Sequence, residues 1–293
     1  MSKILFIGKH GFVGSKVLQG FSSPLQKVIS PPFPDLDITQ KDSIRQYAEM
    51  ADVVINFAAF TDVKTATRDP NGPSWKLNVD GTKNVAEVCK ETGKFLIHIS
   101  TDGVFPYLNT SKGPHDESEI VLDDFKIVSP YGYTKLRGEI EVNKSGAKAA
   151  ILRIAYPFGN PDFPDKDYII KLIKSVRLGY PLFTDQHFTP TYIKSLQTVI
   201  EKLSTLKLTG VFHWVCKGLT TPYAVGVYTN KILGLGLGIK KGSLTKFEDM
   251  NGKQPYAKFG GLATEIAEKR LGLKPPTWEE AIQDFAQELK AIL

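Results

Sequence analysis

The chain has 293 residues, of which 42% are hydrophobic and 23% are charged, a composition that excludes a disordered, collagenous or coiled-coil protein. Its net charge of +6 comes from lysines spread along the chain, without a basic block or an aromatic-interleaved basic stripe, so we expect no nucleic-acid partner. A modest positive charge is equally compatible with an anionic small substrate such as a nucleotide or sugar nucleotide.

No apolar run approaches the ~18 residues that a membrane span requires. Met1 leads directly into a strand-sized run without the features of a secretory signal, so we expect a cytoplasmic protein with no membrane association. Cys89 and Cys216 stand far apart in apolar surroundings, which predicts two buried thiols rather than a disulfide or a zinc site.

Short apolar runs alternate with amphipathic stretches in the first half of the chain. The runs at 3–8, 53–59, 95–100 and 149–156 are typical of strands buried on both faces, and the stretches at 12–21, 78–91 and 131–143 have helical spacing. This order predicts an α/β fold with a Rossmann-type, doubly wound parallel sheet. We expect residues 1–155 to form this domain, with a return to it around 188–222, and residues 156–187 and 223–293 to form a smaller carboxy-terminal cap that ends in a helix over 278–293.

Gly8, Gly11 and Gly14 follow the first predicted strand and open the first predicted helix. Glycine suits this place because a tight turn needs positive φ and because a pyrophosphate must approach bare backbone at a helix N-terminus. The spacing Gly-x-x-Gly-x-x-Gly differs from the Gly-x-Gly-x-x-Gly dinucleotide fingerprint, and purely structural turns also use glycine. The position after the first strand nevertheless favours a dinucleotide-binding loop.

A carboxylate at the end of the second strand usually holds the ribose 2′-hydroxyl of NAD, but here the predicted strand 27–29 ends in Ser30. Lys9 and His10 lie inside the glycine loop, where a positive charge could meet a 2′-phosphate. We therefore expect NADP as cofactor, with NADPH preferred over NADH, although Asp35 and Asp37 could approach the adenosine. The alternative is that Lys9 is only a solvated loop residue.

Tyr131 and Lys135 are four residues apart, on one face of a predicted helix. Thr101 comes just past the end of a buried strand, where open α/β sheets bind ligands. The hydroxyl, the phenol and the ammonium could converge there on one carbonyl, and the ammonium would favour the phenolate of Tyr131. The alternatives are a packing tyrosine, a solvated lysine and a threonine that caps a helix.

These features resemble the extended short-chain dehydrogenase/reductase superfamily and, within it, the dTDP-4-dehydrorhamnose reductase group. The resemblance covers nearly the whole chain. It rests on the glycine loop, the Tyr131–Lys135 pair, the segments 36–39, 56–59, 100–105, 130–139, 152–153 and 185–192, and Trp278, all in that group's order.

The resemblance implies that Tyr131 donates the proton, that Lys135 tunes Tyr131 and holds the nicotinamide ribose, and that Thr101 hydrogen-bonds the reacting oxygen. Together with the glycine loop, it gives as candidate cofactor-binding residues Gly8, Lys9, Gly11, Phe12, Val13, Gly14, Asp37, Ala58, Ala59, Thr61, Asn78, Ser100, Tyr131 and Lys135. The candidate substrate-binding residues are Thr101, Phe105 and Tyr156.

The chain departs from the group's pattern at three positions. Gly103 follows Ser-Thr-Asp where tyrosine is usual, which removes a phenol from the sugar pocket, and Tyr156 stands where tryptophan is usual. Lys16 takes the place of an acid through which some members hold magnesium at a dimer contact, so we expect no metal. The resemblance remains compatible with a homodimer.

The implied reaction is reduction of the 4-keto group of a nucleotide-linked 6-deoxysugar by NAD(P)H. The related 4,6-dehydratases place Asp-Glu after the threonine, whereas Asp102 is followed here by Gly103, which disfavours internal dehydration. Two alternatives stay open. One is a sugar-nucleotide epimerase or a bifunctional epimerase/reductase. The other is a non-catalytic, NADP-binding regulatory subunit on the same fold, like the relative that supports methionine adenosyltransferase.

Overall fold

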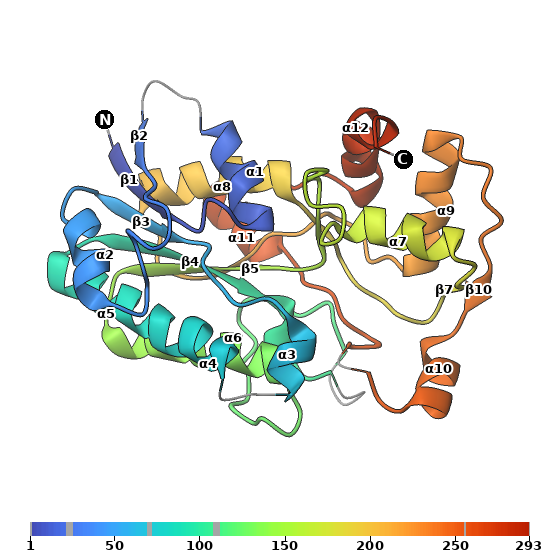
Figure 1. Cartoon of the computed structure of the whole chain (residues 1–293), viewed down its shortest axis with the longest axis horizontal. Helices are drawn as coiled ribbons and strands as arrows, with labels where there is room; N and C mark the ends of the chain where they lie inside the picture. The colour runs from blue at the N-terminus through green and yellow to red at the C-terminus, as the bar shows by residue number, and fades with distance from the viewer. Residues whose placement is uncertain (1, 22–25, 69–71, 108–111, 255, 293) are drawn as a thin grey trace. The chain divides into compact units, whose positions relative to one another are not determined.

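The computed structural model describes residues 2–21, 26–68, 72–107, 112–254 and 256–292 (Figure 1). The chain divides into two compact units, each with its own apolar core. The first unit comprises Met1–Phe105, Ile120–Arg153 and Leu196–Phe212, and the second comprises Pro106–Glu119, Ile154–Ser195 and His213–Leu293.

The first unit is built on a six-stranded sheet of order β2-β1-β3-β4-β5-β9. The strands are β1 (Ser2–Ile7), β2 (Gln26–Ile29), β3 (Val53–Asn56), β4 (Phe95–Thr101), β5 (Ala149–Ile154) and β9 (Gly210–His213). β1 pairs in parallel with β2 and β3, and β3 pairs in parallel with β4. Every residue of β3 is buried, as in a strand that is covered on both faces. The predicted doubly wound sheet is confirmed, although β3 and β5 end earlier than expected.

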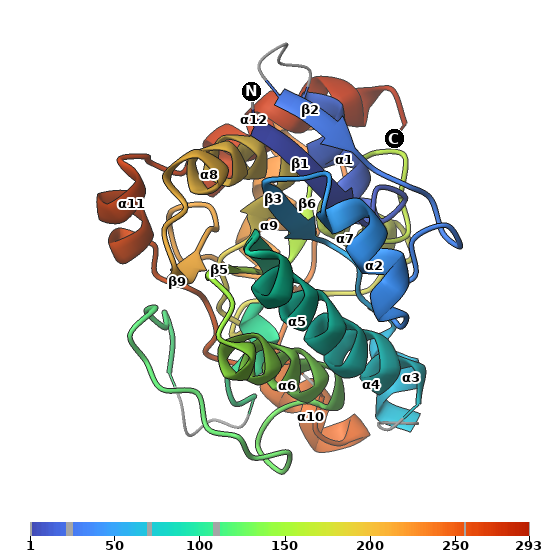
Figure 2. The ribbon, with the colours of Figure 1, turned by 90° about the vertical axis from the view of Figure 1, so that its left-hand side faces the viewer.

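Helices cover both faces of this sheet (Figures 1 and 2). α2 (Lys41–Ala48), α5 (Thr82–Thr92) and α6 (Pro130–Ser145) lie on one face, and α1 (Phe12–Gly20) and α8 (Ile193–Leu206) lie on the other. The side chain of Gln197 joins α8 to α1 by donating to the carbonyl of Gly20. The remaining helical segments are α3 (Val63–Arg68), α4 (Pro73–Trp75), the π-helix η1 (Lys76–Gly81) and the 3₁₀ turn η2 (Asp102–Val104). The helix expected over 78–91 is thus a π-helical turn followed by α5.

In the described part of the chain, the second unit contains two short sheets and several helices. β6 (Pro157–Phe158) pairs with β8 (Thr191–Tyr192), and β7 (Leu182–Phe183) pairs with β10 (Lys241–Gly242), both in parallel. Its helices are α7 (Tyr168–Arg177), α9 (Pro222–Leu233), α10 (Leu244–Asn251), α11 (Glu265–Leu271) and α12 (Trp278–Lys290). A capping box between Thr277 and Glu280 fixes the start of α12, where the terminal helix was expected.

Two glycines let α6 approach its neighbours closely. A Cβ atom at Gly132 would lie 1.8 Å from the carbonyl oxygen of Gly103, and one at Gly138 would lie 2.4 Å from that of Asn78. Both distances are far below van der Waals contact, so neither position has room for a side chain. The first of these contacts packs the start of α6, which carries Tyr131, against the η2 turn that follows Thr101.

Both cysteines are free and buried, one in the core of each unit, as the sequence predicts. Burial raises the pKa of the Cys89 and Cys216 thiols to about 12, which makes them unreactive at neutral pH. Among the helices that the structure describes, none is long and apolar enough to cross a membrane.

We expect Gly132→Ala to destabilise the first unit, because the new methyl group would collide with the Gly103 carbonyl. Overpacking of this kind costs ~1–3 kcal/mol, whereas Gly→Ala in an open helix interior usually stabilises by ~0.5–1 kcal/mol. The matched control is Gly103→Ala, whose Cβ would lie 3.5 Å from Thr101, an ordinary contact. Thermal unfolding of the two variants is the measurement. Equal melting temperatures would contradict the close approach of α6 to the turn.

Candidate active site

The predicted glycine loop joins β1 to α1. Gly8 has φ +95°, and the Gly11 N–H donates to the Gly8 carbonyl at 3.0 Å. A Cβ at Gly14 would lie 2.4 Å from that same carbonyl oxygen, so backbone geometry alone requires glycine at positions 8 and 14. Gly11 is different, because it has φ −78°, is exposed, and would place a Cβ no closer than 3.3 Å to its nearest neighbour.

Gly11 is the N-cap of α1, and no side chain caps the helix there. Phe12 and Val13 are the first residues of α1, so their backbone N–H groups point out of the helix N-terminus. A side chain at Gly11 would stand at the N-cap position, next to these groups. The loop therefore fits the pyrophosphate of a dinucleotide, which needs bare backbone at a helix start.

Lys9 reaches from this loop to the end of β2. Its Nζ donates to the Ser30 carbonyl at 2.6 Å, and the Ser30 hydroxyl donates to the Phe6 carbonyl at 2.7 Å. A positive charge thus lies at the strand end where NAD-binding folds usually carry a carboxylate. Asp37 lies farther along the chain, where its Oδ1 accepts from the Thr39 N–H at 2.9 Å. The ammonium of Lys9 at this strand end is therefore a group that could meet a 2′-phosphate.

The segment after β3 contains three of the predicted cofactor contacts, Ala58, Ala59 and Thr61. Two buried amides hold its backbone. Asn56 Oδ1 accepts from the Ala58 N–H at 3.0 Å, and Asn78 bonds both the N–H and the carbonyl of Phe60, at 2.8 and 3.0 Å. Asn78 is fully buried, so the structure places it behind this segment, where it fixes the backbone conformation.

The three predicted catalytic residues all belong to the first unit. Thr101 is the last residue of β4; its Oγ1 accepts from the Gly103 N–H and donates to Asp102 Oδ1, both at 3.1 Å. Tyr131 lies in the first turn of α6, and Lys135 follows one turn later. Because the start of α6 packs on η2, the structure brings Tyr131 to the end of β4 beside Asp102.

Burial and the nearby Asp102 charge raise the pKa of the Tyr131 phenol above its usual value. The net shift of the Tyr131 pKa is therefore opposite to the lowering that the sequence-based expectation assigned to Lys135, because burial and Asp102 determine its direction. The Lys135 ammonium is itself buried, and its Nζ donates to the Ile99 carbonyl at 2.8 Å. A phenol that stays protonated at neutral pH can act as a proton donor.

Under this site lies a buried ion pair that sequence reasoning missed. Arg153 donates from Nε and Nη2 to the two carboxylate oxygens of Glu139, at 2.9 and 2.7 Å, and Ser100 donates to Glu139 Oε1 at 2.5 Å. The Arg153 guanidinium also stacks on the Phe105 ring, 5.2 Å from its centroid. Ser100 and Phe105, predicted to bind cofactor and substrate, are thus both buried against this ion pair. The sequence indicated this ion pair only by an arginine within an otherwise apolar predicted strand, because an arginine is rarely buried without a partner.

Tyr156 belongs to the second unit. Its ring packs against Tyr168 and Phe188, at centroid distances of 5.2 and 4.6 Å, and its hydroxyl accepts from Gln186 Nε2 at 3.3 Å. The backbone of Tyr156 has φ +42°, a left-handed conformation that few residues other than glycine adopt. Strain of this kind concentrates at functional sites, which is compatible with the predicted substrate contact.

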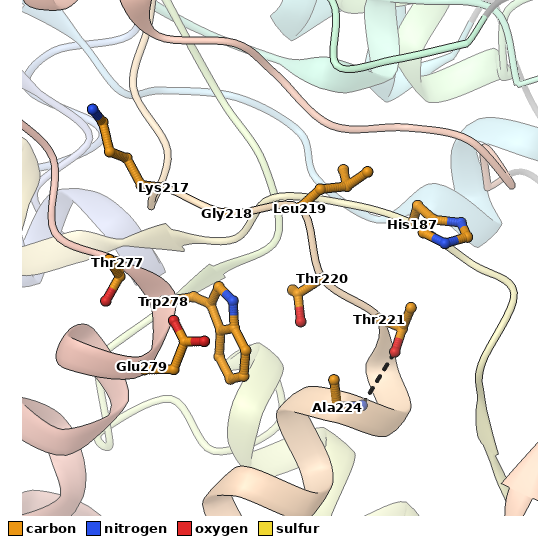
Figure 3. A pocket seen from close by; sticks show the side chains of 10 residues that line it. All are labelled: His187, Lys217, Gly218, Leu219, Thr220, Thr221, Ala224, Thr277, Trp278 and Glu279. Atoms are coloured by element: carbon orange, nitrogen blue, oxygen red, sulfur yellow. Dashed lines mark hydrogen bonds between the residues drawn. The ribbon is translucent and has the colours of Figure 1, made fainter.

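The second unit also holds a cavity of about 670 Å³ (Figure 3). Trp278, Thr221, Thr220, Lys217 and His187 are among the residues that line it. Two buried atoms of this lining, Thr220 Oγ1 and His187 Nδ1, have no hydrogen-bond partner among the described residues. The volume lies in the ~300–1,000 Å³ range of small-molecule sites, and the lining combines aromatic and polar groups as such sites do.

The chain is similar in sequence and in structure to known proteins of one family. The family model described as "RmlD substrate binding domain" matches residues 2–291. The chain is 27% identical to a dTDP-4-dehydrorhamnose reductase of Shigella flexneri over 98% of this chain and 97% of that protein. It is 26% identical to methionine adenosyltransferase 2 subunit beta of Bos taurus over 75% of this chain and 69% of that protein. The crystal structure of a dTDP-4-dehydrorhamnose reductase from Clostridium acetobutylicum matches with a TM-score of 0.86 at 27% identity, covering 98% of this chain and 99% of that one.

Asp102 gives a pH-dependent test of the site. Burial raises the pKa of its carboxyl to about 6, against the opposing hydrogen bonds from Thr101 and Gly103. The folded protein therefore binds this proton more tightly than the unfolded chain, and the resulting stability is lost as pH rises through about 6. We expect Asp102→Asn to raise the melting temperature at pH 7.5 and to lose most of that gain at pH 4. An equal gain at both pH values, or a loss at pH 7.5, would contradict the burial of this charge.

Proposed function

Because the chain belongs to the RmlD substrate-binding domain family, we propose that it is an NADPH-dependent reductase of the 4-keto group of a nucleotide-linked 6-deoxysugar. The observation that carries this proposal is the packing of the start of α6 on the η2 turn, which gathers Thr101 and Tyr131 at the end of β4. The relatives named dTDP-4-dehydrorhamnose reductase, which match along nearly the whole chain, support a sugar nucleotide as the class of substrate.

In this mechanism Tyr131 is the general acid. Its raised pKa keeps the phenol protonated near neutral pH, so it can donate a proton to the ketone oxygen as that oxygen becomes an alkoxide. Thr101 turns its O–H from Asp102 towards the same oxygen and stabilises the developing charge. Lys135, when charged, stabilises the phenolate that remains after proton transfer. NADPH, when bound, supplies the hydride.

The glycine loop and Lys9 would hold this cofactor. The uncapped N-terminus of α1 suits the pyrophosphate, and the ammonium of Lys9 at the end of β2 suits the 2′-phosphate. The segment after β3, held by Asn56 and Asn78, would lie along the rest of the dinucleotide. These features support NADPH over NADH.

The second unit would bind the sugar nucleotide. It covers more than the cap expected over 156–187 and 223–293, because it also contains Pro106–Glu119 and the parts of 188–222 that lie outside Leu196–Phe212. Its cavity supports this role, because the ring of Trp278 and the hydroxyl of Thr221 offer stacking and hydrogen bonding to a nucleotide. Tyr156, with its left-handed backbone, would contact the sugar.

One relative favours a second candidate function. The similarity to methionine adenosyltransferase 2 subunit beta supports a non-catalytic, cofactor-binding subunit on the same fold. The presence of Thr101, Tyr131 and Lys135 together in the first unit argues for catalysis instead. An epimerase would use the same three residues, but it would return its hydride to the substrate and consume no reduced cofactor.

The glycine loop allows a matched test of cofactor binding. We expect Gly11→Val to fold and lose dinucleotide affinity, because φ −78° suits a side chain, whose Cβ would need only a small shift from the Gly8 carbonyl oxygen 3.3 Å away, and the side chain would stand at the start of α1. Gly14→Val should instead lower the melting temperature, because its Cβ would lie 2.4 Å from the Gly8 carbonyl oxygen. Thermal unfolding and titration with NADPH separate the two effects. A Gly11→Val protein that binds NADPH with unchanged affinity would show that the loop has another role.

Tyr131→Phe tests catalysis directly, since it removes one hydroxyl and keeps the ring. Loss of a general acid should lower turnover ~10²–10⁴-fold, with NADPH affinity within a few-fold of the wild type. Tyr133→Phe is the control, because Tyr133 faces Phe125 and Trp75, at centroid distances of 6.2 and 6.3 Å, and its change should be nearly silent. Full reduction of a 4-keto sugar nucleotide by Tyr131→Phe would exclude this tyrosine as the proton donor.

A further inference from the structure

A fully buried histidine lies against Lys135, and the proposed mechanism does not use it. His98 sits in the middle of β4 with 0% exposure, and its Nε2 lies 3.4 Å from Lys135 Nζ. Its Nδ1 lies 3.4 Å from Nδ2 of Asn56, the residue paired with it in register on β3. The imidazole therefore lies between the amide of Asn56 and the amine of Lys135.

The Asn56 amide determines which ring nitrogen carries the proton. Asn56 Oδ1 accepts from the Ala58 N–H at 3.0 Å, so the NH₂ group of the amide faces His98. An amide NH₂ group can only donate, so His98 Nδ1 must accept, and the proton of the neutral ring must sit on Nε2. The ring is neutral because burial, the largest influence on it, holds the His98 pKa well below its usual value.

A proton on Nε2 of His98 favours an uncharged amine at Lys135. An ammonium group has only donors and cannot accept from Nε2–H, whereas a neutral amine has a lone pair that can. The bond from Lys135 Nζ to the Ile99 carbonyl, at 2.8 Å, is available to both forms of the amine. To face a charged Lys135 favourably, the imidazole must move its proton to Nδ1, which breaks its contact with Asn56.

We propose that His98 is a positioning residue whose tautomer, biased by Asn56, sets the protonation state of Lys135. This inference rests on the proposed function, because the charge on Lys135 matters to the reaction only if Tyr131 transfers a proton. A charged Lys135 stabilises the phenolate left by that transfer, and a neutral one does not. Asn56 also holds the segment after β3, so one amide links the predicted cofactor loop to the proton donor.

The other charged and titratable groups around Lys135 come from α6, β5 and η2. Glu139, one turn farther along α6, raises the Lys135 pKa, and Arg153 of β5 pairs with that carboxylate. Tyr131 precedes Lys135 by one turn, and Asp102 of η2 acts on Tyr131. Burial outweighs Glu139 and lowers the Lys135 pKa to about 8. A proton on Nε2 of His98 also lowers the Lys135 pKa, as burial does.

The tautomer can be measured in the full chain without cofactor or substrate. In protein labelled with ¹⁵N-histidine, NMR distinguishes protonated from unprotonated ring nitrogens for each of the five histidines, and His98→Gln identifies the His98 signals. We expect the His98 proton on Nε2 above pH about 8 and its transfer to Nδ1 as pH falls and Lys135 becomes charged. Lys135→Met should keep the proton on Nε2 at every pH. A wild-type tautomer that does not change with pH, or a ring that gains a second proton near its ordinary pKa, would overturn the proposal.

The pH dependence of turnover gives the second readout. In His98→Gln, the amide oxygen can accept a hydrogen bond from a charged Lys135 without any exchange of a proton, so the Lys135 pKa should rise. The basic limb of the kcat/KM profile should then shift upward by about one pH unit, which corresponds to the free energy of one hydrogen bond. His115→Gln replaces another buried histidine, which bonds Glu119 in the second unit, and should keep the wild-type profile. An unshifted limb in His98→Gln would contradict the proposal. A normal tautomer change in a wild-type protein without turnover would instead contradict the proposed function, so the two failures are distinguishable.

Discussion

The candidate site depends on how closely α6 packs against its neighbours. Gly132 meets the Gly103 carbonyl and Gly138 meets the Asn78 carbonyl at distances that leave no room for a Cβ atom. Between these two contacts α6 carries Lys135 into the protein interior, and just before the first it carries Tyr131 to the end of β4. The two glycines of α6 therefore determine where Tyr131, the proposed proton donor, and Lys135 lie.

Buried charge is the second constraint on this region. Glu139 and Arg153 are each less than 5% exposed, and together with Ser100 they join α6, β5 and β4 directly beside Thr101. A buried ion pair of this kind adds little net stability, but loss of either partner leaves an uncompensated charge that costs ~3–5 kcal/mol. The pair therefore acts mainly on geometry, because it holds the end of β4 in one position relative to α6.

Short sequence patterns predicted those parts of the fold that the residues of one short segment determine. Buried parallel strands give apolar runs, so β1, β3, β4 and β5 could be identified, and the glycine pattern located the loop after β1. Strand ends were less predictable: β3 stops at Asn56, where the side chain turns back to bond the Ala58 N–H. The sequence also could not reveal the π-helical turn Lys76–Gly81 inside an otherwise helical pattern.

The chemistry of the site was harder to predict, because it depends on how deeply each side chain is buried and on contacts between residues that are far apart in the chain. Tyr131 and Lys135 were found from their spacing, but the raised pKa of the phenol follows from burial beside Asp102. His98 pairs with a residue 42 positions away, and no motif marks it beyond its place in an apolar strand. Sequence reasoning thus proposed groups that would touch ligands, and the structure showed that some of them, such as Asn78 and Ser100, are buried and hydrogen-bond other residues of the site.

Net consumption of reduced nicotinamide distinguishes a reductase from the other two candidate functions. The wild-type protein would be incubated with dTDP-, UDP- and GDP-linked 4-keto-6-deoxyhexoses and either NADPH or NADH, while the absorbance of the reduced cofactor is followed. We expect stoichiometric oxidation of NADPH with at least one of these sugars and slower oxidation of NADH. Binding of NADPH without oxidation in any combination, or conversion of the sugar without net loss of NADPH, would contradict a reductase and favour the regulatory subunit or the epimerase, respectively.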